Sequence, residues 1–514
     1  MITRRKPMSD FPPSIAAWLL AVGQVLARNL IRPRRRTESA DRSKMPPRPG
    51  DCKGMLLWAI ASCCCLLPVP ARQLLAEPPA SSAGGPPNIV LIISDDQAWS
   101  DYGFMGHAAI KTPHLDELAR RSVLFRRGYV PTSLCRPSLL TMITGRYAHE
   151  HHVTGNDPSP KYAAADSELY AERRAELISQ IDRFDTLPKL LAQRGYVSHQ
   201  SGKWWEGSFR RGGFTAGMTR GFPEPGGRHG DDGLQVGRQT MRPVLDFIDQ
   251  AITDKQPFFV WYAPLLPHAP HNPPAHLLRN YQVPGRPATI AAYFAMCEWF
   301  DQTCGELISH LALRQIREKT LIVYVTDNGW IQDPTQNGFA PRSKQSPYEG
   351  GVRTPIMFSW PGTLKPADRP ELVSSVDLYP TILSAAGIDL QQDAPQPYAG
   401  TNLWPALLTE QPIPRETIFG EGFAHDIPDV HDPEKSLLYR WCIEGRWKLI
   451  LSYAGELNRY AQYHANYPRD PQLFDLQADP REETNVAIEH PDIVNRLSRK
   501  IADWYPVTAS VGGP

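Results

Sequence analysis

The feature that most constrains this chain is a set of short apolar segments, each followed closely by a polar or charged residue. Residues 88–94, NIVLIIS, are apolar and rich in β-branched side chains, which predicts a strand buried on both faces. Residues 257–263 and 321–326 have the same character, and residues 196–200 form a shorter segment of this kind. Strands without a polar face need helices on both sides, as in α/β proteins.

Helical patterns lie between these predicted strands. Thr112-Pro113 is a typical helix start, with Thr as the N-cap and Pro in the first turn. A second helix is predicted to begin near Thr186 and to stop at Gly195, and a third covers residues 241–252. The alternation of strands and helices predicts an α/β fold in which a sheet is flanked by helices.

The pattern changes near residue 411, where short strands precede a terminal helix. The strands are predicted at residues 438–443, 447–451 and 473–476, and the helix at residues 493–504. We therefore expect a catalytic domain over residues 86–410 and a smaller α+β subdomain over residues 411–505.

Residues 155–185 and 208–235 are expected to be loops or insertions near the site. Plain solvated loops are the favoured interpretation, and elements that shape a substrate pocket are the alternative.

The amino end has the features of a targeting segment. Residues 1–54 are basic and Pro-rich, and we interpret them as an over-extended start, with Met55 as the true first residue. Residues 55–76 combine a basic flank, a short apolar run and small residues at the end, which predicts a signal peptide. The protein is therefore expected to be exported, either to a periplasm or by secretion.

Three alternatives stay open at this end of the chain. Residues 15–27 would serve as an earlier export signal, residues 60–63 resemble a lipoprotein cleavage site, and the apolar run would otherwise be a retained helix. That run is shorter than the roughly 20 apolar residues that span a bilayer. A membrane is therefore expected as a partner only through a lipid anchor.

Charge and cysteine content narrow the function. Lys and Arg total 55 against 54 Asp and Glu, a net charge of +1, so no global field argues for a nucleic-acid partner. Half of the 8 cysteines lie in or before the signal segment. The others, Cys135, Cys297, Cys304 and Cys442, are too few for a disulfide framework, so Cys135 needs its own explanation.

Four residues that are able to do chemistry lie just past predicted strands: Asp95, Lys203, His268 and Asp327. Because ligands of open α/β sheets bind beyond the carboxyl ends of the strands, we expect these residues to share one site.

Asp95-Asp96 and Asp327-Asn328 together offer three carboxylates and an amide oxygen. Hard oxygen ligands suit calcium or magnesium, and do not suit zinc or copper. Each pair alone has another interpretation, since Asp-Asp is common at turns and helix caps and Asn328-Gly329 is typical of a hairpin turn.

Cys135 opens the segment CRPSLLTMITG. Pro137 favours the first turn of a helix, so Cys135 is expected at a helix N-terminus, where the dipole favours negative charge. Lys203 and Lys344 are candidates to hold an anion as point charges, and His268 is a candidate proton donor to a leaving oxygen. The alternatives are a buried inert thiol, solvated lysines and a histidine without a catalytic role.

Together these segments resemble the sulfatase family, a branch of the alkaline-phosphatase superfamily. The family signature matches Cys135, Pro137, Ser138, Thr144 and Gly145, within a resemblance that runs from about residue 88 to residue 504. Further family-like segments are residues 88–96, 112–118, 202–204, 268–270, 326–329, 348–355, 374–381, 473–476, 479–480 and 483–487. The resemblance implies an alkaline-phosphatase-like fold, a large mixed sheet flanked by helices with a smaller C-terminal α+β domain.

The resemblance also implies a mechanism and its residues. The signature Cys, here Cys135, would be converted to formylglycine by a formylglycine-generating enzyme or an equivalent partner. The aldehyde hydrates to a diol, one oxygen of which attacks sulfur and displaces the alcohol, and the second hydroxyl then expels sulfate. The implied site comprises calcium ligands Asp95, Asp96, Asp327 and Asn328, sulfate-binding Lys203 and Lys344, and His268 as a sulfate ligand or proton donor. The expected substrate is a sulfated small molecule or polysaccharide.

Two positions depart from the family pattern. The family usually has Arg four residues after the Cys, where this chain has Leu139, and His after Gly-Lys-Trp, where this chain has Trp205. We hypothesise that Arg136 replaces the missing Arg, although its side chain starts from another face of the helix. Two other functions stay open: a phosphodiesterase or phosphonate hydrolase of the same superfamily, and a non-catalytic protein that binds sulfated glycans.

Overall fold

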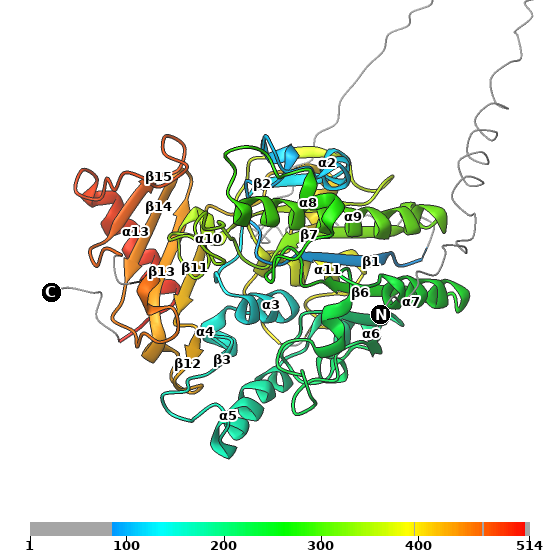
Figure 1. Ribbon diagram of the computed structural model, residues 1–514, viewed down its shortest axis with the longest axis horizontal. Coiled ribbons are helices and arrows are strands. Elements are labelled where there is room, and N and C mark those ends of the chain that lie inside the picture. The colour runs from blue at the N-terminus through cyan, green and yellow to red at the C-terminus, as the bar shows by residue number, and fades with distance from the viewer. Residues whose placement is uncertain (1–84, 395, 465–466, 509–514) are drawn as a thin grey trace, which may run out of the picture. The chain divides into compact units, whose positions relative to one another are not determined.

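Strand β1 (Asn88–Ser94) lies inside a nine-stranded sheet in the computed structural model, which describes residues 85–394, 396–464 and 467–508. The strand order is β10-β2-β8-β7-β1-β6-β4-β5, and β9 pairs with β2. Figure 1 shows β2, β7, β1 and β6 of this sheet. The other strands of this sheet are β2 (Val123–Tyr129), β4 (Val197–Gly202), β5 (Ala216–Gly217), β6 (Phe258–Ala263), β7 (Thr320–Thr326), β8 (Arg353–Ser359), β9 (Ala367–Arg369) and β10 (Val373–Ser374).

The sheet is mixed. Strand β1 runs parallel to both of its neighbours, β6 and β7, and β4 runs parallel to β6. Strand β8 is antiparallel to β7 and to β2. The predicted mixed α/β sheet is therefore confirmed, and its parallel part contains all four strands that were predicted from apolar segments.

Successive residues of β1 enter two different cores because side chains alternate across a strand. Leu91 and its alternate neighbours pack with helices α3 (Cys135–Thr144), α6 (Leu187–Ala192) and α11 (Leu378–Ala385). Val90 and Ile92 pack with α2 (Pro113–Arg120), α7 (Arg242–Thr253) and α9 (Ala288–Leu313). The two helix layers explain why β1 has no polar face. The remaining short helices are α4 (Ala148–His151), α8 (Ala275–Arg279), α10 (Glu349–Val352) and α12 (Trp404–Thr409).

The carboxyl-terminal part has its own antiparallel sheet, in the order β11-β13-β14-β15. Its strands are β11 (Thr417–Phe423), β13 (Leu437–Glu444), β14 (Trp447–Ser452) and β15 (Gln472–Asp475). Helix α13 (Pro491–Trp504) lies beside this sheet (Figure 1). Its Leu497 and Ile501 pack in one apolar cluster with side chains of the strands. The smaller α+β domain is confirmed with one strand, β11, more than predicted. The boundary at residue 410 stays a prediction.

The expectation of loops at residues 155–185 and 208–235 is wrong in part. The first segment contains β3 (Asp157–Pro158), which pairs with β12 (Asp426–Ile427), and helix α5 (Glu168–Ser179). Ser167 caps α5, since its Oγ accepts from the Tyr170 N–H at 3.1 Å. The second segment contributes β5 to the large sheet. The helix was missed because few of its residues are apolar and buried.

The predicted segments 1–54 and 55–76 lie outside the described residues, so export stays a prediction. Within the described part of the chain, no helix is both long enough and apolar enough to cross a membrane. Cys135, Cys297, Cys304 and Cys442 are all buried and free, in agreement with the absence of a disulfide framework that was expected for this part.

Truncation of Leu91 in β1 to alanine should lower the free energy of unfolding by about 2–5 kcal/mol, because the buried side chain leaves a cavity between two packed layers. Leu313→Ala at the end of α9 is the matched control, since that side chain is exposed, and it should change stability by about 0.5 kcal/mol or less. Chemical unfolding of both variants measures the difference. Equal effects would contradict the two-core arrangement.

Candidate active site

The site lies where four neighbouring parallel strands end. In the order β7, β1, β6 and β4, these strands lead into Asp327, Asp95, His268 and Lys203. The register aligns Ser94 with Thr326, so Asp95 and Asp327 follow at the same level. The sequence prediction that these residues share an edge of the sheet is confirmed.

Backbone contacts hold the strand ends together. Asp96 has a φ of 60°, a left-handed conformation that is uncommon outside glycine and clusters at functional sites. Its N–H donates to Asp327 Oδ1 at 3.0 Å, and the Asn328 N–H donates to the same oxygen at 2.7 Å. One carboxylate oxygen therefore joins the ends of β1 and β7.

Gly202 controls the position of Lys203. Its φ is 84°, and a Cβ at this residue would lie 1.8 Å from the carbonyl oxygen of Ala263 at the end of β6. Only glycine permits this close approach, which lets the Lys203 N–H donate to that carbonyl at 2.8 Å.

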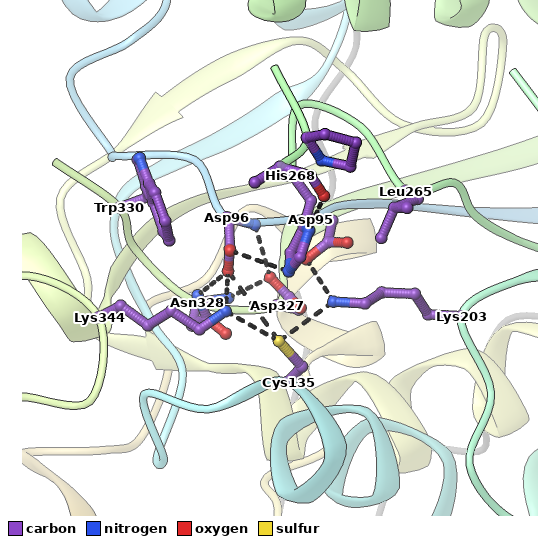
Figure 2. Close-up of polar contacts among 12 residues, drawn as sticks. Asp95, Asp96, Cys135, Lys203, Leu265, His268, Asp327, Asn328, Trp330 and Lys344 are labelled. Carbon is purple, nitrogen blue, oxygen red and sulfur yellow. Dashed lines mark hydrogen bonds and ion pairs between the residues drawn. The ribbon is translucent and has the colours of Figure 1, made fainter. Parts of the chain in front are cut away.

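Cys135 is the first residue of α3, as predicted. Its Sγ lies 3.2 Å from Lys203 Nζ and 3.2 Å from Lys344 Nζ, and 4.0 Å from Asp96 Oδ1. Figure 2 shows the two lysines reaching the sulfur from opposite sides. The sulfur thus lies at a helix N-terminus and between two ammonium groups, which favour an anion, whereas the neighbouring carboxylates oppose one.

Each lysine also pairs with a carboxylate. Lys203 Nζ lies 2.7 Å from Asp95 Oδ1, and Lys344 Nζ lies 2.5 Å from Asp96 Oδ1. Burial alone would lower the pKa of both ammonium groups, but these carboxylates raise the pKa of each above its usual value. Both lysines are therefore cations at neutral pH.

The three carboxylates are under electrostatic strain. Burial raises the pKa of Asp95 and of Asp327, and the neighbouring carboxylates raise it further. Burial also acts to raise the pKa of Asp96, but the ammonium groups of Lys344 and, to a lesser degree, Lys203 outweigh it and lower this pKa below its usual value. A positive charge among these groups would relieve the repulsion.

Four buried oxygens in this cluster have no hydrogen-bond partner: Asp95 Oδ2, Asp96 Oδ2, Asp327 Oδ2 and Asn328 Oδ1. They belong to the four predicted metal ligands. Donor atoms of Asp95, Asp96, Cys135 and His268 also lie within 4.8 Å of one another. Unsatisfied buried oxygens of this hard type fit a divalent cation such as calcium.

His268 faces the same cluster. Its Nε2 lies 3.3 Å from Asp96 Oδ2, and its Nδ1 lies 2.5 Å from the Ala269 carbonyl oxygen. Burial and Lys203 lower the pKa of the ring well below its usual value, so the ring is neutral. When Nδ1 donates to Ala269, Nε2 presents a lone pair toward a carboxylate, which favours a cation or a donor group between them.

Burial raises the pKa of the Cys135 thiol to about 12, although Lys203 and Lys344 act to lower it. The unmodified thiol is therefore protonated at neutral pH, and a protonated thiol is a poor nucleophile. The Cys135 thiol therefore stays neutral although two ammonium groups lie beside it.

Sequence comparison decides the family. A family model described as Sulfatase matches residues 87–388, which is more than half of the chain. The chain belongs to the sulfatase family. A second model, described as N-sulphoglucosamine sulphohydrolase, C-terminal, matches residues 342–505. The protein is a sulfuric ester hydrolase of the alkaline-phosphatase superfamily.

Individual relatives agree with this assignment. N-acetylgalactosamine-6-sulfatase of Canis lupus familiaris is 30% identical over 370 residues, which cover 64% of this chain and 67% of the relative. The crystal structure of Ps i-CgsB in complex with k-i-k-neocarrahexaose is 25% identical, with a TM-score of 0.62, and covers 82% of this chain and 92% of that chain. Phosphonate Monoester Hydrolase of Agrobacterium radiobacter shares the fold, with 20% identity, a TM-score of 0.58, and coverage of 81% and 95%.

The two departures from the sulfatase pattern meet in space. Leu139 and Trp205 line a cavity of about 10 Å³ together with Arg136 and Glu206, and with Leu140 and Trp204. Arg136 forms a bidentate pair with Glu206, at 2.7 Å from Nε and 2.8 Å from Nη2, while Nη1 bonds the Asn156 carbonyl at 3.2 Å. All three guanidinium nitrogens are engaged away from Cys135. The hypothesis that Arg136 replaces the missing Arg at the nucleophile therefore finds no support.

Two aromatic rings at the lysines were missed by the sequence analysis of the site. Lys344 Nζ lies 5.7 Å from the centre of the Trp330 ring, and Lys203 Nζ lies 5.3 Å from that of Trp205. Such rings favour the cation and exclude water from one side of it. Trp330 follows Asp327-Asn328-Gly329 directly, but a single Trp after a turn gives no signal of this contact.

Removing the carboxylate of Glu206 by substitution with leucine should destabilise the fold by about 3–5 kcal/mol, because the buried Arg136 then lacks its partner. The double substitution Arg136→Leu with Glu206→Leu is the control, and it should recover most of the loss since no unpaired charge remains. Unfolding free energies of the three proteins test the pair. A double variant no more stable than Glu206→Leu would contradict it.

Proposed function

We propose that this chain hydrolyses sulfate esters of carbohydrates with an aldehyde side chain, formylglycine, made from Cys135, and with a bound calcium ion. The observation that carries the proposal is the place of Cys135 Sγ, 3.2 Å from each of two buried ammonium groups and beside four unsatisfied oxygens. Because the thiol stays protonated, a hydrated aldehyde at this position would supply the nucleophilic hydroxyl.

Asp95, Asp96, Asp327 and Asn328 would hold the calcium ion. Their four orphaned oxygens are of the type that calcium prefers. Bound there, the cation would act as a Lewis acid that stabilises negative charge on oxygen at the reacting centre.

Lys203 and Lys344 would bind the sulfate oxygens. Carboxylates fix both ammonium groups beside residue 135, and both remain charged. They are therefore already in place to stabilise the negative charge that develops on the sulfate oxygens in the transition state. His268 would contact the ester oxygen of the leaving group through Nε2. Because the His268 ring is neutral, its Nε2 must take up a proton in the substrate complex before it is able to donate one to the leaving group.

The carbohydrate substrate rests on relatives. The relative from Canis lupus familiaris is named for N-acetylgalactosamine 6-sulfate, and the solved Ps i-CgsB complex holds a neocarrahexaose. We also propose that the protein is exported, on the basis of residues 55–76.

A non-catalytic glycan-binding protein is the second candidate function. The observation in its favour is that Leu139 and Trp205 stand where the sulfatase pattern has Arg and His. Without those groups, conversion of Cys135 or attack on sulfate would fail while the anion site remains.

Coexpression with a formylglycine-generating enzyme should convert Cys135 to the aldehyde, which mass spectrometry of the tryptic peptide detects. The converted protein should cleave an aryl sulfate faster than an aryl phosphate diester. Cys135→Ala should lower kcat by roughly 10⁴-fold or more, as loss of a covalent nucleophile does elsewhere.

Protein made without the modifying enzyme is the matched control and should be inactive. An unmodified thiol after coexpression, with sulfated glycans still bound, would favour the binding protein. Faster cleavage of the phosphate diester would instead favour a phosphodiesterase.

Removal of calcium with a chelator should lower the melting temperature, because the three buried carboxylates then repel one another. Calcium at 100 times its Kd should restore about 2.7 kcal/mol of stability. Asp327→Asn should weaken this calcium dependence, whereas Asp182→Asn, in an exposed pair with Arg211, should not. A melting temperature of the parent protein that does not change with calcium concentration would contradict a metal site.

A further inference from the structure

The segment that ends near residue 235 passes directly beside Lys203. The Trp204 N–H donates to the His229 carbonyl at 3.1 Å, and the rings of Trp205 and His229 lie 5.4 Å apart, centre to centre. Arg228 is the residue directly before His229, so this hydrogen bond places it beside the Trp204 backbone, one residue past Lys203. A segment expected to be a plain loop thus carries a cation to the edge of the site.

A buried carboxylate fixes Arg228 in place. Its Nε lies 3.1 Å and 3.0 Å from the two oxygens of Asp157, and Nη2 also donates to Asp157. Asp157 follows Asn156, whose Oδ1 accepts from the Arg136 N–H at 3.1 Å, next to Cys135. Two connections therefore tie Arg228 to segments next to Cys135. Its neighbour His229 bonds the backbone just past β4, and its partner Asp157 adjoins the residue that contacts the start of α3.

The ion cluster around Asp157 keeps an excess of positive charge. Asp157 accepts from Arg174 at 3.0 Å as well as from Arg228, so two cations share one carboxylate. Burial acts to raise the pKa of Asp157, but its arginine partners lower it below the usual value, so it is ionised. Nearby His425 is neutral because burial lowers its pKa. Asp426 has its own cation, Arg459, at 3.5 Å.

Arg228 differs from the inner cations in its access to solvent. The side chain of Arg228 is 35% exposed, whereas those of Lys203 and Lys344 are 2% and 8% exposed. Its bonds to Asp157 use Nε and Nη2, which leaves Nη1 outside that pair. A planar guanidinium with an open edge suits a carboxylate or sulfate.

We propose that Arg228 binds a second anionic group of the substrate, a carboxylate or a further sulfate that neighbours the scissile sulfate ester. This inference rests on the proposed sulfatase function. The two lysines contact residue 135 and are placed for the sulfate under attack. Arg228 pairs with Asp157 instead and is partly exposed to solvent. The substrate is thus a polyanionic saccharide, and Arg228 is a specificity-determining residue.

The test compares three probes: N-acetylgalactosamine 6-sulfate, the same sugar with a second sulfate, and a disaccharide in which a uronic acid adjoins the 6-sulfated sugar. Binding of each is measured by calorimetry in the Cys135→Ala background, which reads recognition without turnover. Arg228→Gln should reduce the preference for one of the dianionic probes over the monosulfate by roughly ten- to a hundredfold, as loss of a charge-assisted contact does. The probe that loses this preference identifies the second group as sulfate or as carboxylate.

Two variants serve as controls. Arg228→Lys keeps the charge and should retain part of the preference, which separates recognition from loss of folding. Arg211→Gln lies in the same inserted segment and pairs with exposed Asp182, so it should leave the preference unchanged. The kcat and KM of the converted enzyme on the same probes are measured in parallel.

Equal weakening of all three probes in Arg228→Gln would overturn the inference, because Arg228 would then serve the scissile sulfate or the fold. An unchanged preference, or no binding of either dianionic probe by the parent, would also overturn it. Arg228-dependent binding without hydrolysis by the converted enzyme would support the anion site and refute the sulfatase function, so the two failures are distinguishable.

Discussion

The balance of buried charge around Cys135 determines how the rest of this site works. Three carboxylates, Asp95, Asp96 and Asp327, face two ammonium groups, Lys203 and Lys344, which leaves one negative charge when all are ionised. Such a site repels the anionic sulfate ester that the family hydrolyses. A divalent cation reverses the sign of the net charge, so the same residues then attract an anion. Burial raises the pKa of Asp95 and of Asp327, and repulsion from the neighbouring carboxylates, which a cation would offset, adds to this rise.

Parallel pairing in the sheet is what collects these charges, and this part of the site could be predicted from the sequence. The apolar segments at residues 88–94 and 321–326 have no polar face, so they had to be inner strands, and their first polar residues had to lie at one edge. Lys344 could not be placed in this way. It lies 18 residues beyond β7 in a loop, and only its contacts with Asp96 and Cys135 locate it. Here the family resemblance, and not the pattern, supplied the residue.

Local rules failed where a residue's partner lies far away in the chain. Arg136 follows Cys135, but successive residues of a helix point about 100° apart, so its side chain leaves the nucleophile and meets Glu206. Leu139, four residues after Cys135, shares the face of the helix that carries the sulfur. The Leu139 side chain and the Arg136–Glu206 pair therefore form a surface without net charge where the sulfatase pattern has two polar groups. Helix α5 was missed for a related reason, since its buried side is narrow and its contacts are tertiary.

This surface without net charge leaves the charged groups around the nucleophile in two separate sets. Buried cations are stable only when they are paired, and Lys203 and Lys344 are paired with the carboxylates of the cluster itself. Arg228 is more exposed to solvent and is held by Asp157, which lies in the short strand β3 outside the large sheet. Lys203 follows a strand end of the large sheet and Lys344 lies in a loop beside it, whereas Arg228 belongs to the inserted segment at residues 208–235. If Arg228 recognises substrate as proposed, the segment at residues 208–235 has two roles: it supplies the outer charge, and through the His229 carbonyl it supports the backbone next to Lys203.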